Sequence, residues 1–168
     1  ALLVVTISNP VTQTGFIDRF LITAEAYRLP VTIVFNKIDI YSEKDQLKLE
    51  ELIIAYSKVG YHCLNVSAET GEGVTEIKKM LTDKTTMLSG HSGAGKSTLI
   101  NKIDSNLELK TGDISESHFK GKHTTTFAEM FELDFGGLII DTPGIKGLGI
   151  VDIEKEELSH YFLEMRAL

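Results

Sequence analysis

Residues 90–97 read GHSGAGKS and fit the pattern G-x-x-x-x-G-K-[ST], whose backbone N–H groups surround nucleotide phosphates. The apolar run from Thr85 to Leu88 predicts a strand before this loop, and a helix is predicted to begin at about Ser97. That strand, loop and helix are the context that the pattern requires. Lys96 would place a positive charge against the outer phosphates, and the Ser97 hydroxyl would bind Mg²⁺. The residues predicted to bind the phosphates are Gly90, His91, Ser92, Gly93, Ala94, Gly95, Lys96, Ser97 and Thr98.

Apolar runs that predict strands alternate along the chain with stretches of helical periodicity. The run from Val31 to Phe35 is apolar throughout, which is typical of a strand buried on both faces of a parallel sheet. The pattern predicts the α/β class, a P-loop fold with a doubly wound, mostly parallel sheet that binds ligands at the carboxyl ends of its strands. Strands are predicted near residues 2–7, 31–35, 61–66, 85–88, 127–133 and 138–140, helices over 16–27, 42–60, 74–81, from 97 and over 154–168, and a long mobile loop over 104–122.

A second motif, N-K-x-D at residues 36–39, indicates which base is bound. The Asp39 carboxylate can accept hydrogen bonds from N1–H and the exocyclic amine of guanine, whereas adenine presents the wrong donors and acceptors. Asn36 would brace the loop and Lys37 would lie along the base, although a strand-end turn with a solvated lysine has the same sequence. The stretch Ser67-Ala68-Glu69 is similar to a loop that donates a backbone N–H to guanine O6. The residues predicted to bind the base are Asn36, Lys37, Asp39, Ser67 and Ala68.

Two stretches predict the remaining contacts with Mg²⁺ and the γ-phosphate. In the D-T-P-G sequence of residues 141–144, Asp141 would hold Mg²⁺ through water and the Gly144 N–H would sense the γ-phosphate, unless the stretch is an ordinary turn. Three threonines follow Lys122-His123, and one of them, with Thr125 preferred, could complete the Mg²⁺ shell only when the γ-phosphate is present. The same threonines could equally begin a strand. The predicted metal ligands are therefore Ser97, Thr125 and Asp141.

The motifs are those of GTPases, but N-K-x-D comes before the phosphate loop, so their order is circularly permuted. With GKHTTT at residues 121–126 and the closing run 147–152, the chain resembles, over nearly its whole length, the ribosome small subunit dependent GTPase A family. The resemblance implies a cytoplasmic bacterial GTPase that binds GTP or GDP with Mg²⁺, hydrolyses GTP and assists late maturation of the small ribosomal subunit.

The resemblance also implies a domain organisation. Residues 1–152 would be the GTPase domain, and residues 153–168 a helix leading toward a zinc-binding domain, with an OB-fold domain before Ala1. Zinc ligands and most of the surface that binds rRNA would lie in those two domains. Because the chain opens on Ala1 directly before a strand-like run, we expect it to be part of a longer protein.

The hydrolytic machinery is predicted to be incomplete. Many small GTPases carry a glutamine directly after the D-x-x-G glycine to orient the attacking water, and here that position is Ile145. Slow intrinsic hydrolysis, stimulated by the small subunit, is therefore expected. Gly93 replaces an asparagine that recruits potassium in related GTPases. The resemblance makes His123 a catalytic candidate, although a surface histidine fits equally. The predicted catalytic residues are Lys96, Thr125, Gly144 and His123.

Three other functions remain open at this point. The chain could be a switch whose affinity for a partner depends on the bound guanine nucleotide, with GTP hydrolysis serving only to reset it. Ile145 favours this alternative. It could be a permuted GTPase acting on the large ribosomal subunit, which GKHTTT disfavours. It could be an adenine-specific kinase or ATPase, which Asp39 disfavours.

Composition narrows the choice further. The 168 residues, 42% hydrophobic and 24% charged, suit one globular domain. The formal charge of −7 argues against sequence-independent binding of nucleic-acid phosphates by the chain as a whole. No apolar run approaches the roughly 20 residues that cross a bilayer. The single cysteine, Cys63, has no partner for a disulfide and no companions for a zinc site, which fits a reducing cytoplasm. We expect a monomer without membrane contact.

Overall fold

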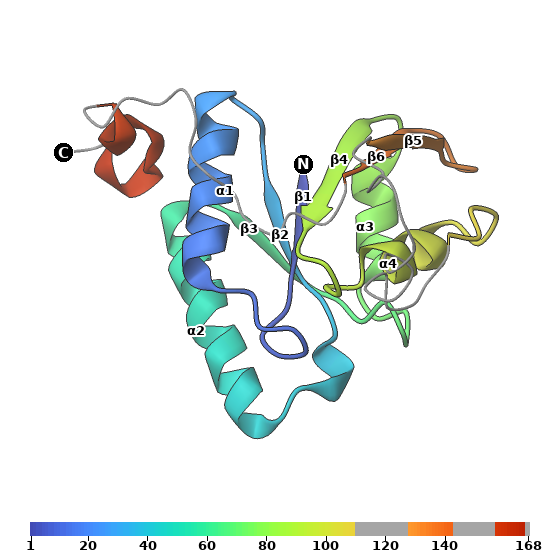
Figure 1. Ribbon diagram of the computed structural model, residues 1–168, viewed down its shortest axis with the longest axis horizontal. Helices are drawn as coiled ribbons and strands as arrows, with labels where there is room; N and C mark the ends of the chain where they lie inside the picture. The colour runs from blue at the N-terminus through green and yellow to red at the C-terminus, as the bar shows by residue number, and fades with distance from the viewer. Residues whose placement is uncertain (110–127, 143–156, 167–168) are drawn as a thin grey trace, which may run out of the picture.

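Six strands form one sheet in the computed structural model, which describes residues 1–109, 128–142 and 157–166 (Figure 1). The strand order is β3-β2-β1-β4-β6-β5, and every neighbouring pair is parallel except β5 with β6. The predicted α/β class with a mostly parallel sheet is therefore confirmed. The strands are β1 (Leu2–Val5), β2 (Thr32–Phe35), β3 (His62–Asn65), β4 (Thr85–Gly90), β5 (Glu129–Glu132) and β6 (Leu138–Asp141).

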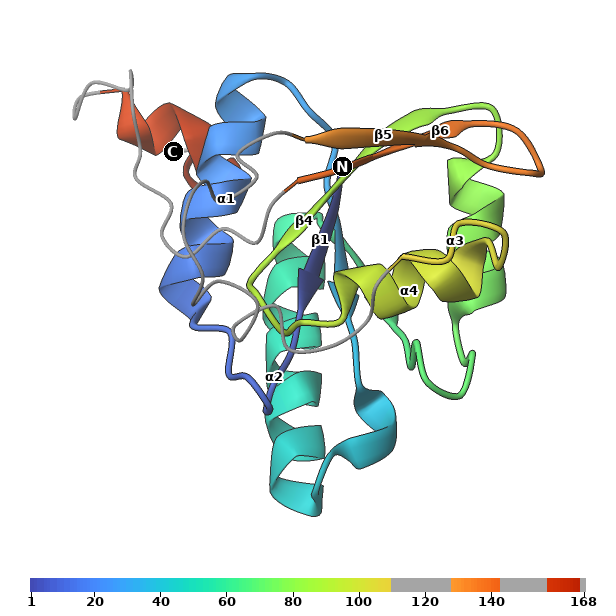
Figure 2. The same ribbon diagram turned by 45° about the vertical axis from the view of Figure 1, so that its right-hand side comes forward.

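Helices cover both faces of the sheet, as the alternating pattern predicts. Strands β1 and β2 are buried along their whole length, because alternate side chains of each strand enter two different hydrophobic clusters. One cluster lies under α1 and α2, and the other under α3 and α4 (Figures 1 and 2). The helices are α1 (Thr14–Ala26), α2 (Glu43–Val59), α3 (Val74–Leu81) and α4 (Lys96–Ile103).

Local sequence fixes where α2 begins and ends. The Ser42 hydroxyl accepts a hydrogen bond from the Asp45 N–H, and the Asp45 carboxylate accepts one from the Ser42 N–H at 3.1 Å, which is a capping box. Gly60 closes the helix in the left-handed conformation (φ +112°). Both ends agree with the prediction from sequence.

The register of the sheet brings the chemical motifs to one edge. In β4, Leu88 lies opposite Leu2 of β1 and Asp141 of β6. Since parallel strands end at the same edge, the phosphate loop after β4 lies beside Asp141 and beside the loop that follows β2. Gly90 is required there: its φ is +150°, and a Cβ would collide with the Val4 carbonyl oxygen.

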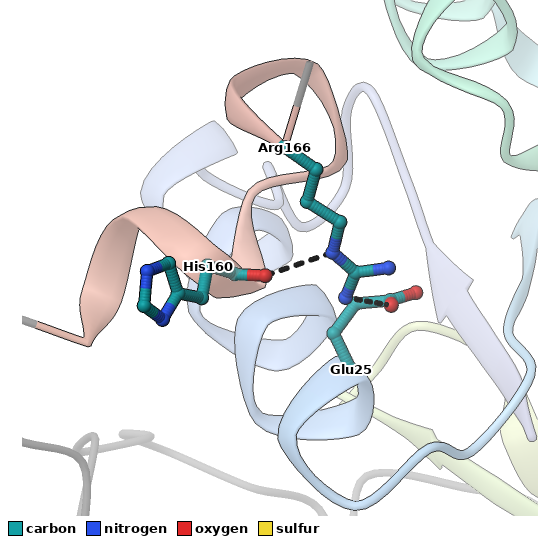
Figure 3. A network of polar contacts seen from close by, with 3 residues as sticks. All are labelled: Glu25, His160 and Arg166. Carbon is teal, nitrogen blue, oxygen red and sulfur yellow. Dashed lines mark hydrogen bonds and ion pairs between the residues drawn. The ribbon is translucent and has the colours of Figure 1, made fainter. Parts of the chain in front are cut away.

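The C-terminal helix predicted over residues 154–168 is wrong for the part that the structure describes. Two short 3-10 helices, η3 (Leu158–Tyr161) and η4 (Leu163–Met165), are separated by Phe162 in an extended conformation (φ −91°, ψ 114°). The Arg166 guanidinium donates to the Glu25 carboxylate of α1 at 2.7 Å and to the His160 carbonyl at 2.8 Å (Figure 3). Contacts with α1 therefore replace the hydrogen bonds of a continuous helix.

The predicted mobile loop is also corrected at its start. The Asn101 side chain both donates to the Leu109 carbonyl and accepts from the Leu109 N–H, each at 2.7 Å. The Asp104 carboxylate, which is 2% exposed, accepts from the Asn106 N–H at 2.9 Å and from the Asp134 N–H at 2.8 Å. Residues 104–109 are thus held by hydrogen bonds, and residues 110–122 lie outside the described residues.

Within the described ranges, no helix has the length and apolar character to span a membrane.

The turn between β5 and β6 yields a stability prediction. Gly137 has φ +102°, and a Cβ there would collide with the Leu81 carbonyl oxygen. Gly137→Ala should lower the free energy of unfolding by about 2 to 3 kcal/mol, because backbone must move. Gly15→Ala in α1 is the control, since its Cβ would meet only the flexible end of Arg19. Urea unfolding of both variants tests the prediction, which fails if they are equally stable.

Candidate functional site

A buried asparagine joins the loops that carry the motifs. Asn36, at the end of β2, is fully buried. Its Nδ2 donates to the Ala94 carbonyl in the phosphate loop at 2.9 Å, and its Oδ1 accepts from the Ala68 N–H after β3 at 3.0 Å. The Asn36 side chain therefore joins three loops that follow three parallel strands, and it fixes the segments predicted to bind the base and the phosphates relative to each other.

The backbone of the predicted phosphate loop depends on its glycines. Gly93 and Gly95 adopt positive φ values of +79° and +92°, and Gly95 leads directly into α4. A Cβ on Gly95 would collide with the Asn36 amide nitrogen, so close approach as well as conformation demands glycine. The imidazole of His91 packs on the ring of Phe16 with centroids 3.9 Å apart. Successive backbone N–H groups at a helix start can then face a phosphate.

Lys96 lies inside this loop and is only 8% exposed. Its ammonium group donates to the carbonyls of Gly90 at 2.9 Å and His91 at 3.2 Å. Burial lowers the pKa of Lys96, and the negative charge of Asp141 opposes that shift. The Lys96 ammonium is therefore held at the loop by two carbonyl groups, which phosphate oxygens could replace as hydrogen-bond acceptors.

Asp141 and Ser97 are the described residues that could hold Mg²⁺. The Oδ1 atom of Asp141 is buried and has no hydrogen-bond partner in the described part of the chain. Burial raises the pKa of Asp141, Lys96 lowers it, and Glu129 on the paired strand raises it again. A divalent cation would satisfy the orphaned oxygen, and Ser97 is partly buried in the first turn of α4. Magnesium takes few ligands from a protein when phosphates and water supply the rest, so these residues fit it.

Within residues 1–109, 128–142 and 157–166, no group of three or more His, Cys, Asp or Glu side chains could hold a metal ion.

Thr142 next to Asp141 was not singled out from sequence. Its hydroxyl donates to the Leu88 carbonyl at 2.9 Å and to the Ser89 hydroxyl at 3.3 Å, which fastens the end of β6 to β4.

The loop predicted to bind the base presents its carboxylate to solvent. Asp39 is exposed in a short 3-10 turn, η1 (Ile38–Ile40). Lys37 has φ +68°, and its ammonium group donates to the Asn9 carbonyl at 2.6 Å. Asp39 thus lies at the surface, while Lys37 ties the loop to the segment after β1.

After β3, the N–H groups of Ser67 and Ala68 both donate within the protein. The Ala68 N–H, in the stretch predicted to meet guanine O6, donates to Asn36. The Ser67 N–H donates to the Glu72 carbonyl at 3.0 Å, and the Ser67 hydroxyl accepts from the Thr70 N–H at 3.0 Å. Ser67 and Ala68 therefore shape the loop in this structure.

Sequence reasoning missed Tyr41. Its hydroxyl accepts from the Ile7 N–H at 2.9 Å and donates to the Asn36 carbonyl at 2.5 Å. Burial raises the pKa of Tyr41 to about 12, and the Ile7 hydrogen bond opposes the shift. No sequence signal could have identified it, because Ile7 lies 34 residues earlier in the chain.

Four predicted or discussed residues cannot be compared with the structure. His123, Thr125, Gly144 and Ile145 lie outside the described residues. Of the predicted site, the structure joins Ala94 of the phosphate loop and Ala68 through Asn36. Asp141 acts on the charge of Lys96, whereas the ammonium group of Lys37 contacts Asn9, which is not a predicted site residue.

Comparison with known proteins agrees with this arrangement. The family model described as RsgA GTPase matches residues 1–151. A Bacteroides thetaiotaomicron protein named small ribosomal subunit biogenesis GTPase RsgA 2 is 58% identical over 164 residues, which are 98% of this chain and 53% of that protein. A Flavobacterium psychrophilum protein named small ribosomal subunit biogenesis GTPase RsgA is 56% identical over 165 residues, 96% of this chain and 50% of its own length. The chain thus spans about half the length of the curated relatives it matches.

Two solved structures share the fold. YjeQ from Thermotoga maritima superposes with a TM-score of 0.81 at 44% identity, covering 97% of this chain and 54% of that one. YloQ, described as a circularly permuted GTPase, gives 0.73 at 26% identity, covering 99% of this chain and 52% of that one. The predicted permuted P-loop fold is confirmed.

The buried carboxyl yields a pH prediction. Nucleotide affinity in the presence of Mg²⁺ should fall as the pH drops through the pKa of Asp141, because the protonated carboxyl cannot hold the ion. Since that pKa lies above its ordinary value of 3.8, the loss should begin where ordinary aspartates are still ionised. Titrations of GDP from pH 8 downward, with and without Mg²⁺, measure the effect.

Two variants serve as controls for that titration. Asp141→Asn should bind weakly with Mg²⁺ at every pH and lack the step. Asp134→Asn, an exposed carboxylate in the β5–β6 turn, should keep it. A step that survives in Asp141→Asn contradicts the assignment.

Proposed function

Because the chain belongs to the RsgA GTPase family, we propose that it binds guanine nucleotides and hydrolyses GTP to GDP and phosphate for a protein that acts in small ribosomal subunit biogenesis. The observation that carries the proposal is the pair of hydrogen bonds made by the Asn36 side chain, since they join the loops predicted to bind the phosphates and guanine. Residues 1–152 are proposed as the GTPase domain.

Base selection is assigned to Asp39. Its exposed carboxylate offers two acceptor oxygens, which match the N1–H and 2-amino donors of guanine and have no such pair to meet on adenine. Asn36 and Lys37 fix the backbone that precedes Asp39 through their contacts with Ala94 and Asn9. Guanine is therefore preferred because adenine would leave the carboxylate unpaired.

Hydrolysis is assigned to in-line attack of water on the γ-phosphorus, with charge stabilised by groups already in place. The Lys96 ammonium exchanges the Gly90 and His91 carbonyls for phosphate oxygens. Ser97, Asp141 and Thr125 would hold Mg²⁺, which when bound neutralises charge on the phosphates. The Gly144 N–H would contact the γ-phosphate.

The intrinsic rate is proposed to be slow. Ile145 stands where many GTPases have the glutamine that orients water, so a polar group must come from elsewhere. His123 is the proposed candidate within this chain, and a partner that places it beside the γ-phosphate would complete the site.

The partner proposed is the small ribosomal subunit with its rRNA, after the printed names of the relatives. The net charge of −7 fits a core that leaves RNA contact to other domains, for which an OB-fold domain before and a zinc-binding domain after the chain are proposed. We also propose that the protein is a monomer in the cytoplasm and does not contact a membrane. Ile145 also favours a second function, a nucleotide-controlled binding switch that hydrolysis only resets.

Replacing Asp39 tests the base assignment. Asp39→Asn should lower the affinity for GDP by at least about 10-fold and shift preference toward xanthosine diphosphate, whose 2-oxo group can accept from the new amide. Glu43→Gln, an exposed carboxylate in the first turn of α2, is the control. Competition binding gives the ratio, and unchanged guanine preference in Asp39→Asn rejects the role.

Turnover of GTP by the full-length protein tests the partner. We expect slow hydrolysis alone and strong stimulation by purified small subunits, with large subunits as the control. Loss of stimulation in His123→Ala, with nucleotide affinity retained, supports its role, and unchanged stimulation removes it. Nucleotide-dependent binding to small subunits without stimulated hydrolysis would favour the switch, whereas no response to small subunits contradicts the proposed partner.

A further inference from the structure

The loop that carries Asp39 is closed by a tyrosine hydroxyl. The loop begins at Asn36, whose N–H donates to the Val5 carbonyl of β1 at 2.9 Å. It ends at Tyr41, whose hydroxyl donates back to the carbonyl of Asn36 and accepts from the N–H of Ile7. The last residue of the loop thus binds the backbone of the first, with Asp39 between them.

We propose that Tyr41 is a positioning residue for guanine selection: its hydroxyl fixes the loop of residues 36–41 so that the Asp39 carboxylate meets the base. This inference rests on the proposed guanine-nucleotide function. Tyr41 itself does not contact the base in this assignment, because its side chain is 8% exposed while Asp39 lies in the exposed turn.

A second tie runs from the same loop to the same segment. Ile7 lies in the connection from β1 to α1, and two residues later the Asn9 carbonyl accepts from the Lys37 ammonium. That connection is itself fixed, since the Thr6 N–H donates to the Thr12 hydroxyl at 3.0 Å and the Thr12 N–H donates to the Thr6 carbonyl at 2.9 Å. Tyr41 and Lys37 therefore anchor the base-reading loop to a segment that is itself held by hydrogen bonds.

The hydroxyl matters here separately from the ring. The ring of Tyr41 belongs to the hydrophobic cluster under α1 and α2, where phenylalanine would fill nearly the same space. Phenylalanine would leave the Ile7 N–H and the Asn36 carbonyl without their buried partner, and both would seek water or another group. The loop would then gain freedom at the end nearest Asp39.

The expected effect is on discrimination between bases. Guanine offers Asp39 two donors, whereas hypoxanthine, which lacks the 2-amino group, offers one. When the Asp39 carboxylate is held in place, it can accept from both donors of guanine, so the protein binds GDP more tightly than inosine diphosphate. When the carboxylate is mobile, this difference in affinity becomes smaller. Tyr41→Phe should lower GDP affinity about 10-fold and reduce the ratio of GDP to inosine diphosphate affinity several-fold. The KM for GTP should rise while kcat stays nearly unchanged.

Tyr56→Phe is the matched control. Tyr56 is a buried tyrosine of the same cluster, 9% exposed, whose hydroxyl donates to the Asp18 carboxylate at 2.8 Å, away from the loops of the site. Both variants remove one buried hydroxyl, so both should be less stable to urea. Only Tyr41→Phe should change the ratio of GDP to inosine diphosphate affinity.

The experiment measures dissociation constants of GDP, inosine diphosphate and ADP for the wild-type protein and both variants by titration calorimetry. A lower GDP to inosine diphosphate ratio in Tyr41→Phe alone supports the proposal. An unchanged ratio in Tyr41→Phe, or an equal fall in Tyr56→Phe, overturns it. Wild-type protein that binds ADP as tightly as GDP would instead overturn the proposed function.

Should Tyr41→Phe not fold, 4-aminophenylalanine at position 41 takes its place. The aromatic amine still donates to the Asn36 carbonyl but accepts poorly from the Ile7 N–H. A reduced ratio of GDP to inosine diphosphate affinity supports the proposal, and a ratio equal to that of the wild type overturns it.

Discussion

The two hydrogen bonds of the buried Asn36 side chain are the interaction on which the site depends. One end of the amide holds the phosphate loop at Ala94 and the other holds the loop after β3 at Ala68. Because the amide is fully buried, neither bond has water as a ready substitute. The same amide leaves no room for a Cβ on Gly95, so the sequence of the phosphate loop and the position of Asn36 constrain each other.

The parallel sheet explains why a permuted order of motifs still yields one site. In the described part of the chain, the ends of β2, β3, β4 and β6 meet at one edge, with β1 between β2 and β4. Which strand comes first along the chain does not alter where its end lies in the sheet. A phosphate loop placed in the middle of the sequence can therefore meet the loop proposed to bind the base, which precedes it by more than 50 residues.

Charge is arranged around this edge before any ligand arrives. Lys96 is buried and bound to carbonyls of its own loop, whereas Asp141 is buried with one oxygen that lacks a hydrogen-bond partner. Each carries a pKa shifted by burial and partly restored by the other. In the proposed function, phosphate would bind the Lys96 ammonium and Mg²⁺ would bind the unpaired oxygen of Asp141. The binding of phosphate and the binding of Mg²⁺ are therefore coupled.

The sequence by itself determined the features that depend on neighbouring residues: the strand, loop and helix around residues 90–97, the capping box at Ser42 and Asp45, the α/β class and the motif order. These follow from local periodicity, local hydrogen bonds and glycine conformation. Only the tertiary structure decided that Tyr41 binds Ile7 and Asn36, that the Ala68 N–H serves Asn36, and that residues 157–166 form two turns against α1. Those features join residues far apart in the chain, and their energy appears only once the sheet has brought the partners together.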